Sequence, residues 1–134
     1  MSSAENAHGL VIFASDKAKV SLFYQQVLGM QVGESFATHD LLAREGLEVV
    51  VHAIPQSYAA DTDVKNPPEL RSDTAIKPIF TVPDLQRTYL LANEAGGFLK
   101  PLNEAWQYRG YLVLDGCDPE GNVVQFRQRA LPLD

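Results

Sequence analysis

The same order of strand and helix patterns occurs twice in this chain of 134 residues. The start of the first helix pattern, "ASDKAKVSLFY", aligns with that of the second, "VPDLQRTYLLA", so that Asp16 matches Asp84 and Phe23 matches Leu91. Each helix pattern follows one strand pattern and precedes three more, which makes a βαβββ module. A repeat of this size indicates structural duplication, and it predicts an α+β fold built from two tandem βαβββ modules.

The first module is predicted over residues 8–56. An apolar run of strand-forming residues at 10–14 opens it, and a helix follows over 15–30 with one apolar face at i, i+3, i+4 spacing. Ser15 or Asp16 can cap the start of this helix, and Gly29 can end it. The remaining predicted strands are 30–35, 39–45 and 47–54.

The second module is predicted over 76–129, after a proline-rich and polar linker at 57–75 that includes the helix-breaking pair Pro67-Pro68. Pro83 suits a helix start and Gly96-Gly97 a helix end, so a helix is predicted over 83–97. The residues "DPEGN" at 118–122 predict a tight turn. The predicted strands are 76–82, 98–102, 108–116 and 122–129.

Composition limits the classes of partner. The net charge is −6 and the sequence pI is near 4.9, which argues against a nucleic-acid or anionic-membrane partner because both require a positive surface. Cys117 is the single cysteine, so no internal disulfide can form, as is usual in a reducing compartment. No apolar run reaches membrane-spanning length and "MSSAENAHG" has no signal-peptide pattern, so we expect a cytoplasmic protein.

Three segments together resemble a known superfamily. They are "VIFASDKAKVSLFYQQVLGM", "FTVPDLQRTYLLANEAGG" and "LDGCDPEGNVVQF". In this order they resemble the vicinal oxygen chelate superfamily, which includes glyoxalase I, extradiol dioxygenases, fosfomycin-resistance enzymes and bleomycin-binding proteins. The resemblance implies that the sheets curl into open cups, with the helices outside, and that the two cups form one cleft (a glyoxalase-like fold). It implies no particular reaction, because this fold hosts many chemistries.

Metal-using relatives take ligands from the first and last strand of each module. Counting from the aligned aspartates and turn glycines places these positions at Gly9 and Val50 in the first module, and at Lys77 and Gln125 in the second. Glycine and valine offer no ligand, a protonated lysine has no lone pair, and glutamine is a weak ligand. We therefore expect no metal and no other cofactor. A one-residue shift in alignment would bring in His8 together with His52.

His52, in "GLEVVVHAIPQ", lies two residues beyond Val50 and so shares its strand face. Three interpretations stay open. It is a core histidine with a hydrogen-bond partner, a cleft residue that binds a ligand or acts as a general base, or a metal ligand. The neighbouring ligand position favours the cleft over the metal.

Four further residues are candidates for ligand binding. Lys77 and Gln125 are polar at positions predicted to face the cleft, although Lys77 can equally reach solvent at a sheet edge. Trp106 and Arg109, in "NEAWQYRGYLVLDG", offer an aromatic ring and a guanidinium to a flat or anionic ligand. The alternative is an exposed loop whose tryptophan closes the core or a dimer contact.

Three functional hypotheses follow. The first is a metal-independent protein that binds a small organic molecule, with His52, Gln125, Trp106, Arg109 and Lys77 as contacts. The second is a lyase, isomerase or dioxygenase-type enzyme with a divergent metal site or with His52 as catalytic base. The third is an interaction module whose cleft is filled by its own side chains. A homodimer is also expected, since exposed sheet edges and the habits of this superfamily favour one.

Overall fold

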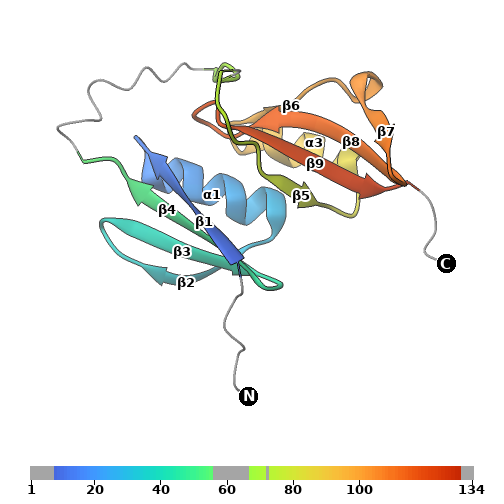
Figure 1. The fold of residues 1–134 in the computed structure, drawn as a ribbon. Helices are drawn as coiled ribbons and strands as arrows, with labels where there is room; N and C mark the ends of the chain where they lie inside the picture. The colour runs from blue at the N-terminus through green and yellow to red at the C-terminus, as the bar shows by residue number, and fades with distance from the viewer. Residues whose placement is uncertain (1–7, 56–66, 72, 131–134) are drawn as a thin grey trace. The chain divides into compact units, whose positions relative to one another are not determined.

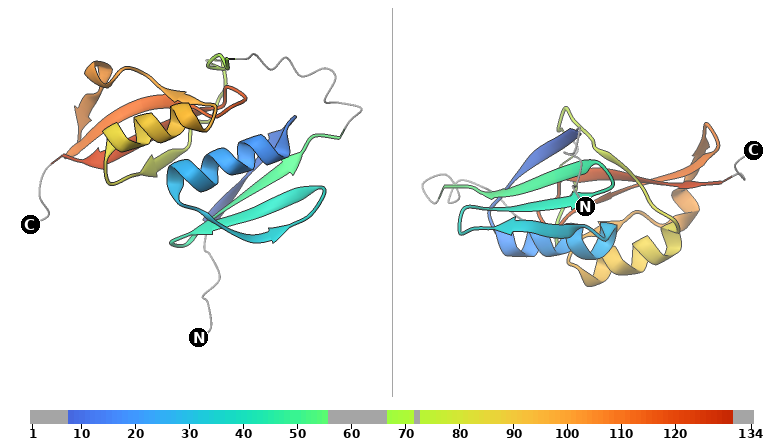
Figure 2. Two further views of the ribbon diagram at one scale, coloured as in Figure 1. Left: turned by 180° about the vertical axis from the view of Figure 1, so that it is seen from behind. Right: turned by 90° about the horizontal axis from the view of Figure 1, so that it is seen from below.

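The computed structural model describes residues 8–55, 67–71 and 73–130. The chain divides into two compact units, Met1–Asp63 and Val64–Asp134, and each is described by itself. In the described residues each unit has one open, mixed sheet covered on one face by one α-helix (Figures 1 and 2). The predicted α+β class with two βαβββ modules is confirmed. The single cleft stays a prediction, and most of the predicted linker lies outside the described residues.

Unit 1 follows the predicted βαβββ order. Its sheet has the strand order β1-β4-β3-β2, with β1 parallel to β4 and the other pairs antiparallel. The alternation of buried and exposed residues places α1 against one face, where Ile12, Val49, Val51 and Leu42 are buried. The elements are β1 His8–Ala14, α1 Lys17–Leu28, β2 Gln31–Ser35, β3 His39–Arg44 and β4 Leu47–Ala53.

Both ends of α1 are where the sequence predicts them. Asp16, rather than Ser15, is the N-cap, and its carboxylate accepts a hydrogen bond from the backbone N–H of Lys19 at 3.1 Å. Gly29 ends the helix in the left-handed conformation with φ 66°. In the second helix Asp84 has the same role, accepting from the backbone N–H of Gln86. The alignment of Asp16 with Asp84 is therefore confirmed.

Unit 2 has a five-stranded sheet of order β5-β9-β8-β6, with β7 paired to β8. Its helix, α3, covers one face, where Phe80, Val124 and Phe126 are buried. The side chain of Gln128 accepts from the backbone N–H of Leu85 at 2.7 Å and so joins β9 to the helix start. The elements are β5 Ile79–Thr81, α3 Leu85–Glu94, β6 Phe98–Leu99, a 3-10 turn at Leu102–Glu104, β7 Trp106–Tyr108, β8 Tyr111–Cys117 and β9 Val123–Arg129.

The single strand predicted over 108–116 is wrong at its start. Arg109 and Gly110 have φ angles of 52° and 83°, and they form a two-residue turn between β7 and β8 that pairs Tyr108 with Tyr111. Two left-handed residues in succession give the turn that best matches the twist of a hairpin. Strands 76–82 and 98–102 are also shorter than predicted: Pro78 interrupts the first and a 3-10 turn follows the second.

The register of the two sheets supports the duplication. In unit 1, β1 pairs Val11 with Val50, and in unit 2 the equivalent strand β5 pairs Ile79 with Gln125. Two residues further along these strands, and on the same sheet faces, Phe13 pairs with His52 and Thr81 pairs with Arg127. His52 and Arg127 therefore occupy the same place in the two modules.

No helix in the described residues is long and apolar enough to span a membrane.

Candidate functional site

The face of each sheet that its helix leaves uncovered carries the candidate functional residues. In unit 1, strand alternation places His52 and Val50 on this open face, opposite the buried Val49 and Val51. Large apolar side chains on the open face stay exposed, among them Val11 at 53% and Phe13 at 59%. Exposed aromatic and aliphatic side chains around a histidine are typical of a binding surface rather than of a filled core.

Four rings of unit 1 form a row in which each ring contacts the next. We call Phe13, His52, His39 and Phe36 the ring row. The centroids of Phe13 and His52 are 5.6 Å apart, and those of His52 and His39 are 5.8 Å apart with the planes 8° from parallel. Phe36 lies 5.1 Å from His39 and is 55% exposed. These distances are within the range of favourable ring contacts, so the row offers several ring faces and edges to an aromatic ligand.

The hydrogen bond of His52 fixes where its lone pair lies. Its Nδ1 is 2.8 Å from the backbone oxygen of Ala53. A carbonyl oxygen only accepts, so Nδ1 carries the hydrogen, and in the neutral ring Nε2 holds the lone pair. His52 is half-buried and satisfied at one nitrogen. The other nitrogen can accept a hydrogen bond or a proton, so the arrangement suits both the ligand-binding and the general-base interpretation.

The residues at the expected metal-ligand positions do not form a donor set for a divalent ion. The ammonium of Lys77 makes an ion pair with Asp115 at 3.0 Å and is therefore a charged donor with no lone pair. Gln125 donates its amide to the same carboxylate at 3.2 Å. Their counterparts in unit 1, Gly9 and Val50, carry no ligand atom in their side chains. No group of three or more His, Cys, Asp or Glu suited to a metal occurs among the described residues.

His8 does not complete a metal site with His52. The register pairs His8 with Leu47 and Phe13 with His52. Side chains alternate along a strand, so His8 is on the same sheet face as Ile12 and Ala14, which face the helix. His52 is on the open face. A shift in alignment therefore cannot bring the two imidazoles onto one ion, because they belong to opposite faces of the sheet.

The open face of unit 2 is polar and positively charged. Asp115 links Lys77 and Gln125, as described above. Further along β9, the guanidinium of Arg127 lies 4.2 Å from the centre of the Tyr111 ring and its Nε donates to the hydroxyl of Thr81 at 3.1 Å. The guanidinium of Arg129 lies 4.9 Å from the same ring. Two cations on one tyrosine ring make a surface suited to a negatively charged ligand.

Trp106 and Arg109 have different positions in the β7–β8 hairpin. Trp106 pairs with Val113 and its side chain is 42% exposed. Arg109 is exposed at the tip of the turn. The expected aromatic–guanidinium combination is present nearby, but Tyr111, Arg127 and Arg129 make it. Ligand roles for Trp106 and Arg109 stay predictions.

The sequence alone did not reveal Phe13, Phe36 and His39 of the ring row. It also did not reveal Tyr111, Arg127 and Arg129 on the open face of unit 2. On β9 the signal was present: "QFRQR" alternates, so Gln125, Arg127 and Arg129 share a face. The ring row had a weaker signal, because Phe36 and His39 flank a turn and their proximity to His52 depends on the pairing of β3 with β4. His39 is half-buried.

Cys117 has a structural role in unit 2. Its side chain is fully buried, and burial, with the Asp118 charge as a smaller effect, raises the pKa of the thiol to about 12. A thiol with such a pKa is almost entirely protonated at neutral pH, and the thiolate is the reactive form. Cys117 is therefore unsuited to act as a nucleophile.

Comparison with known proteins identifies the fold. No protein-family model matches the chain. A curated relative, Polycomb group RING finger protein 6 of Rattus norvegicus, is 28% identical over 124 residues, which is 89% of this chain. The chain spans about a third of that protein's length, 32%, so the match carries no argument about activity or partners.

Solved structures match over nearly the whole chain. A glyoxalase/bleomycin resistance protein/dioxygenase family enzyme from Burkholderia phytofirmans PsJN has a TM-score of 0.68 at 20% identity, covering 94% of this chain and 99% of its own. The bleomycin resistance determinant encoded on transposon Tn5 has a TM-score of 0.59 at 16% identity, with 98% and 100% covered. A fosfomycin resistance protein from Listeria monocytogenes has a TM-score of 0.63 at 14% identity, with 100% and 97% covered. The chain therefore has the fold of these glyoxalase and bleomycin- and fosfomycin-resistance structures, which is the glyoxalase-like fold that its sequence motifs predict.

Proposed function

We propose that this protein binds a small organic molecule on the open faces of its sheets without a divalent metal ion. The observation that carries the proposal is which residues occupy the four positions where relatives place metal ligands. Gly9 and Val50 carry no ligand atom in their side chains, and Lys77 and Gln125 both bind Asp115. The open faces nevertheless keep exposed rings and charged groups that a purely structural sheet does not need.

His52 is the central contact in this proposal. It lies between Phe13 and His39 in the ring row, and its Nε2 can accept a hydrogen bond from a ligand. Gln125, Lys77, Trp106 and Arg109 are proposed as further contacts. A cytoplasmic location and a homodimer stay predictions of the sequence.

The proposal is tested by a thermal-shift screen of small aromatic molecules in the presence of EDTA, followed by calorimetric titration of the hits. His52→Ala is expected to weaken binding about tenfold, because a ring contact and a hydrogen bond together contribute about 1.4 kcal/mol. His8→Ala is the matched control, since this exposed histidine belongs to the opposite face of the same sheet, and it should bind as the wild type does. Ligands that bind only after metal is added would contradict the proposal.

An enzymatic function with His52 as general base is the second candidate, favoured by the hydrogen bond that leaves the lone pair on Nε2. In an assay of lyase, isomerase or dioxygenase substrates, His52→Ala should then reduce kcat by at least about a hundredfold, as expected for loss of a general base. A kcat that His52→Ala leaves unchanged would eliminate this candidate.

A further inference from the structure

A hollow of about 370 Å³ in unit 2 is lined by side chains of mixed character. Arg71, Lys77, Lys100 and Asp115 supply its charged groups, and Leu70 and Val123 are among its apolar ones. This volume is near the lower end of the range for small-molecule sites. All the residues that line the hollow belong to unit 2, whereas the ring row belongs to unit 1.

The hollow is positively charged in a negatively charged protein. Three of its side chains are cationic and one is anionic, whereas the whole chain has a net charge of −6. Asp115 is already compensated by the ammonium of Lys77 and the amide of Gln125. Within the described part of the chain, the ammonium of Lys100 makes no hydrogen bond or ion pair. The excess positive charge is therefore available to a ligand.

The walls of the hollow are held by backbone hydrogen bonds. The Nε of Arg71 donates to the backbone oxygen of Glu120 at 3.0 Å, and its backbone N–H donates to the oxygen of Gly121 at 2.9 Å. The backbone N–H of Lys100 donates to the oxygen of Asp115 at 2.9 Å. The side chain of Arg71, anchored in this way, loses less conformational entropy when it binds an anion than a free surface side chain does. The backbone bond of Lys100 fixes the point from which its side chain extends.

We propose that this hollow binds a small organic anion, a molecule with a carboxylate or phosphate head group and a short apolar body. Lys100 and Lys77 meet the head group, and Leu70 and Val123 contact the body. The inference deepens the proposed function, because it names the ligand class that Lys77 serves, and it adds Lys100 and Arg71 to the binding residues. Charge-assisted hydrogen bonds from several cations are the usual means of holding such head groups.

The test is a titration of the whole protein, followed by amide chemical shifts in ¹⁵N-labelled samples, at constant ionic strength. The probes are inorganic phosphate and the straight-chain carboxylates from acetate to hexanoate, with chloride as reference. Saturable shifts are expected at Lys100, Asp115 and Val123. Affinity that increases with carboxylate length would assign the apolar walls to the ligand body, and binding of phosphate alone would assign the site to a phosphate head group.

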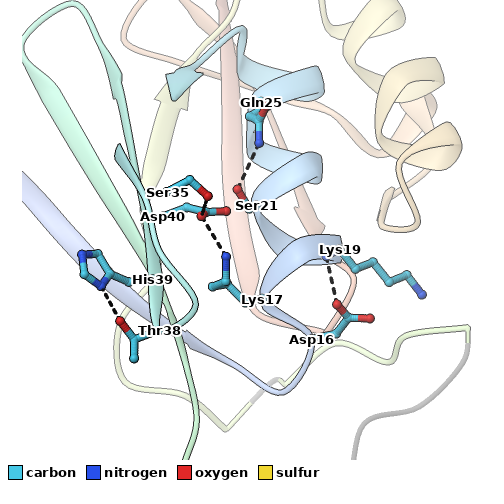
Figure 3. A network of polar contacts seen from close by, with 9 residues as sticks. All are labelled: Asp16, Lys17, Lys19, Ser21, Gln25, Ser35, Thr38, His39 and Asp40. Atoms are coloured by element: carbon cyan, nitrogen blue, oxygen red, sulfur yellow. Dashed lines mark hydrogen bonds and ion pairs between the residues drawn. The ribbon is translucent and has the colours of Figure 1, made fainter. Parts of the chain in front are cut away.

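Lys100→Met keeps the apolar stem and removes the charge, and it is expected to weaken binding at least tenfold, whereas Lys100→Arg should retain it. Lys19→Met is the matched control, because Lys19 is an exposed lysine on α1 whose ammonium extends away from its neighbours (Figure 3). Equal affinities for Lys100→Met and Lys19→Met, or no saturable shift, would overturn the inference. Shifts confined to residues around His52 would also overturn it while leaving the proposed function intact.

Discussion

Replacing Gly121 with alanine is expected to lower the free energy of unfolding of unit 2 by about 3 kcal/mol or more. Gly121 has φ 84°, a left-handed conformation that costs an alanine about 1–2 kcal/mol. An added Cβ would also collide with the backbone oxygen of Glu69, which cannot move as a flexible side chain can. Overpacking of this kind typically costs a further 1–3 kcal/mol. Urea denaturation monitored by Trp106 fluorescence reports on this unit.

Gly110→Ala is the matched control in the same unit. Gly110 has nearly the same φ, 83°, but its added Cβ would meet only a guanidinium nitrogen of Arg129, at 4.0 Å. We expect a loss of about 1 kcal/mol, from backbone conformation alone. Equal losses for the two variants would show that the contact with Glu69 is unimportant and that the turn at 118–122 does not hold the segment before β5.

Replacing Asp40 with asparagine is expected to destabilise unit 1 by about 2–3 kcal/mol. The carboxylate of Asp40 is nearly buried and accepts hydrogen bonds from the ammonium of Lys17 at 2.8 Å and the hydroxyl of Ser35 at 2.6 Å (Figure 3). These contacts join β3 to the first turn of α1 and to β2. The amide keeps the size of the carboxylate but loses the charge, so Lys17 remains beside a neutral group. Because Lys17 can turn toward solvent, the loss is smaller than for a fully buried pair.

The destabilisation caused by Asp40→Asn should become smaller as the pH is lowered. Burial alone would raise the pKa of Asp40, but hydrogen bonds from Lys17, Ser35 and Ser21 and the charge of Lys17 outweigh it and lower the pKa below the ordinary value of 3.8. The unfolded chain therefore binds this proton at higher pH than the folded chain does. The stabilisation is fully present above about pH 5 and is lost as pH falls below 3.8 through the folded pKa.

Urea unfolding of the wild type and of Asp40→Asn from pH 7 to pH 3 measures this dependence. The difference in unfolding free energy should be constant near neutrality and should shrink below pH 3.8. Asp16→Asn is the control, because asparagine caps a helix about as well as aspartate, and its effect should stay within about 0.5 kcal/mol. A difference that grows as pH falls would contradict the assignment of Asp40 as a stabilising carboxylate.

Local signals in the sequence were sufficient for most of the secondary structure. Helix starts at Asp16 and Asp84 follow from capping chemistry, and the end at Gly29 follows from the freedom of glycine at positive φ. The hairpin at Arg109-Gly110 was missed because a non-glycine residue in the left-handed region has a weak sequence signal. In its counterpart at Glu45-Gly46, with φ angles of 47° and 86°, Gly46 is the predicted break between two strands, whereas Glu45 was predicted as the last residue of the first strand.

The sequence by itself determined the duplication, the strand face on which His52 lies, and the absence of ligand atoms at Gly9 and Val50. Alternation along a strand is a local property and needs no knowledge of the partner strands. Only the tertiary structure decided which groups meet. Strand register brought His39 and Phe13 to His52, opposed Arg127 to Thr81, and placed Asp115 between Lys77 and Gln125. These contacts join residues far apart in the chain, and pairing across a sheet is fixed by the packing of the whole module rather than by any one segment.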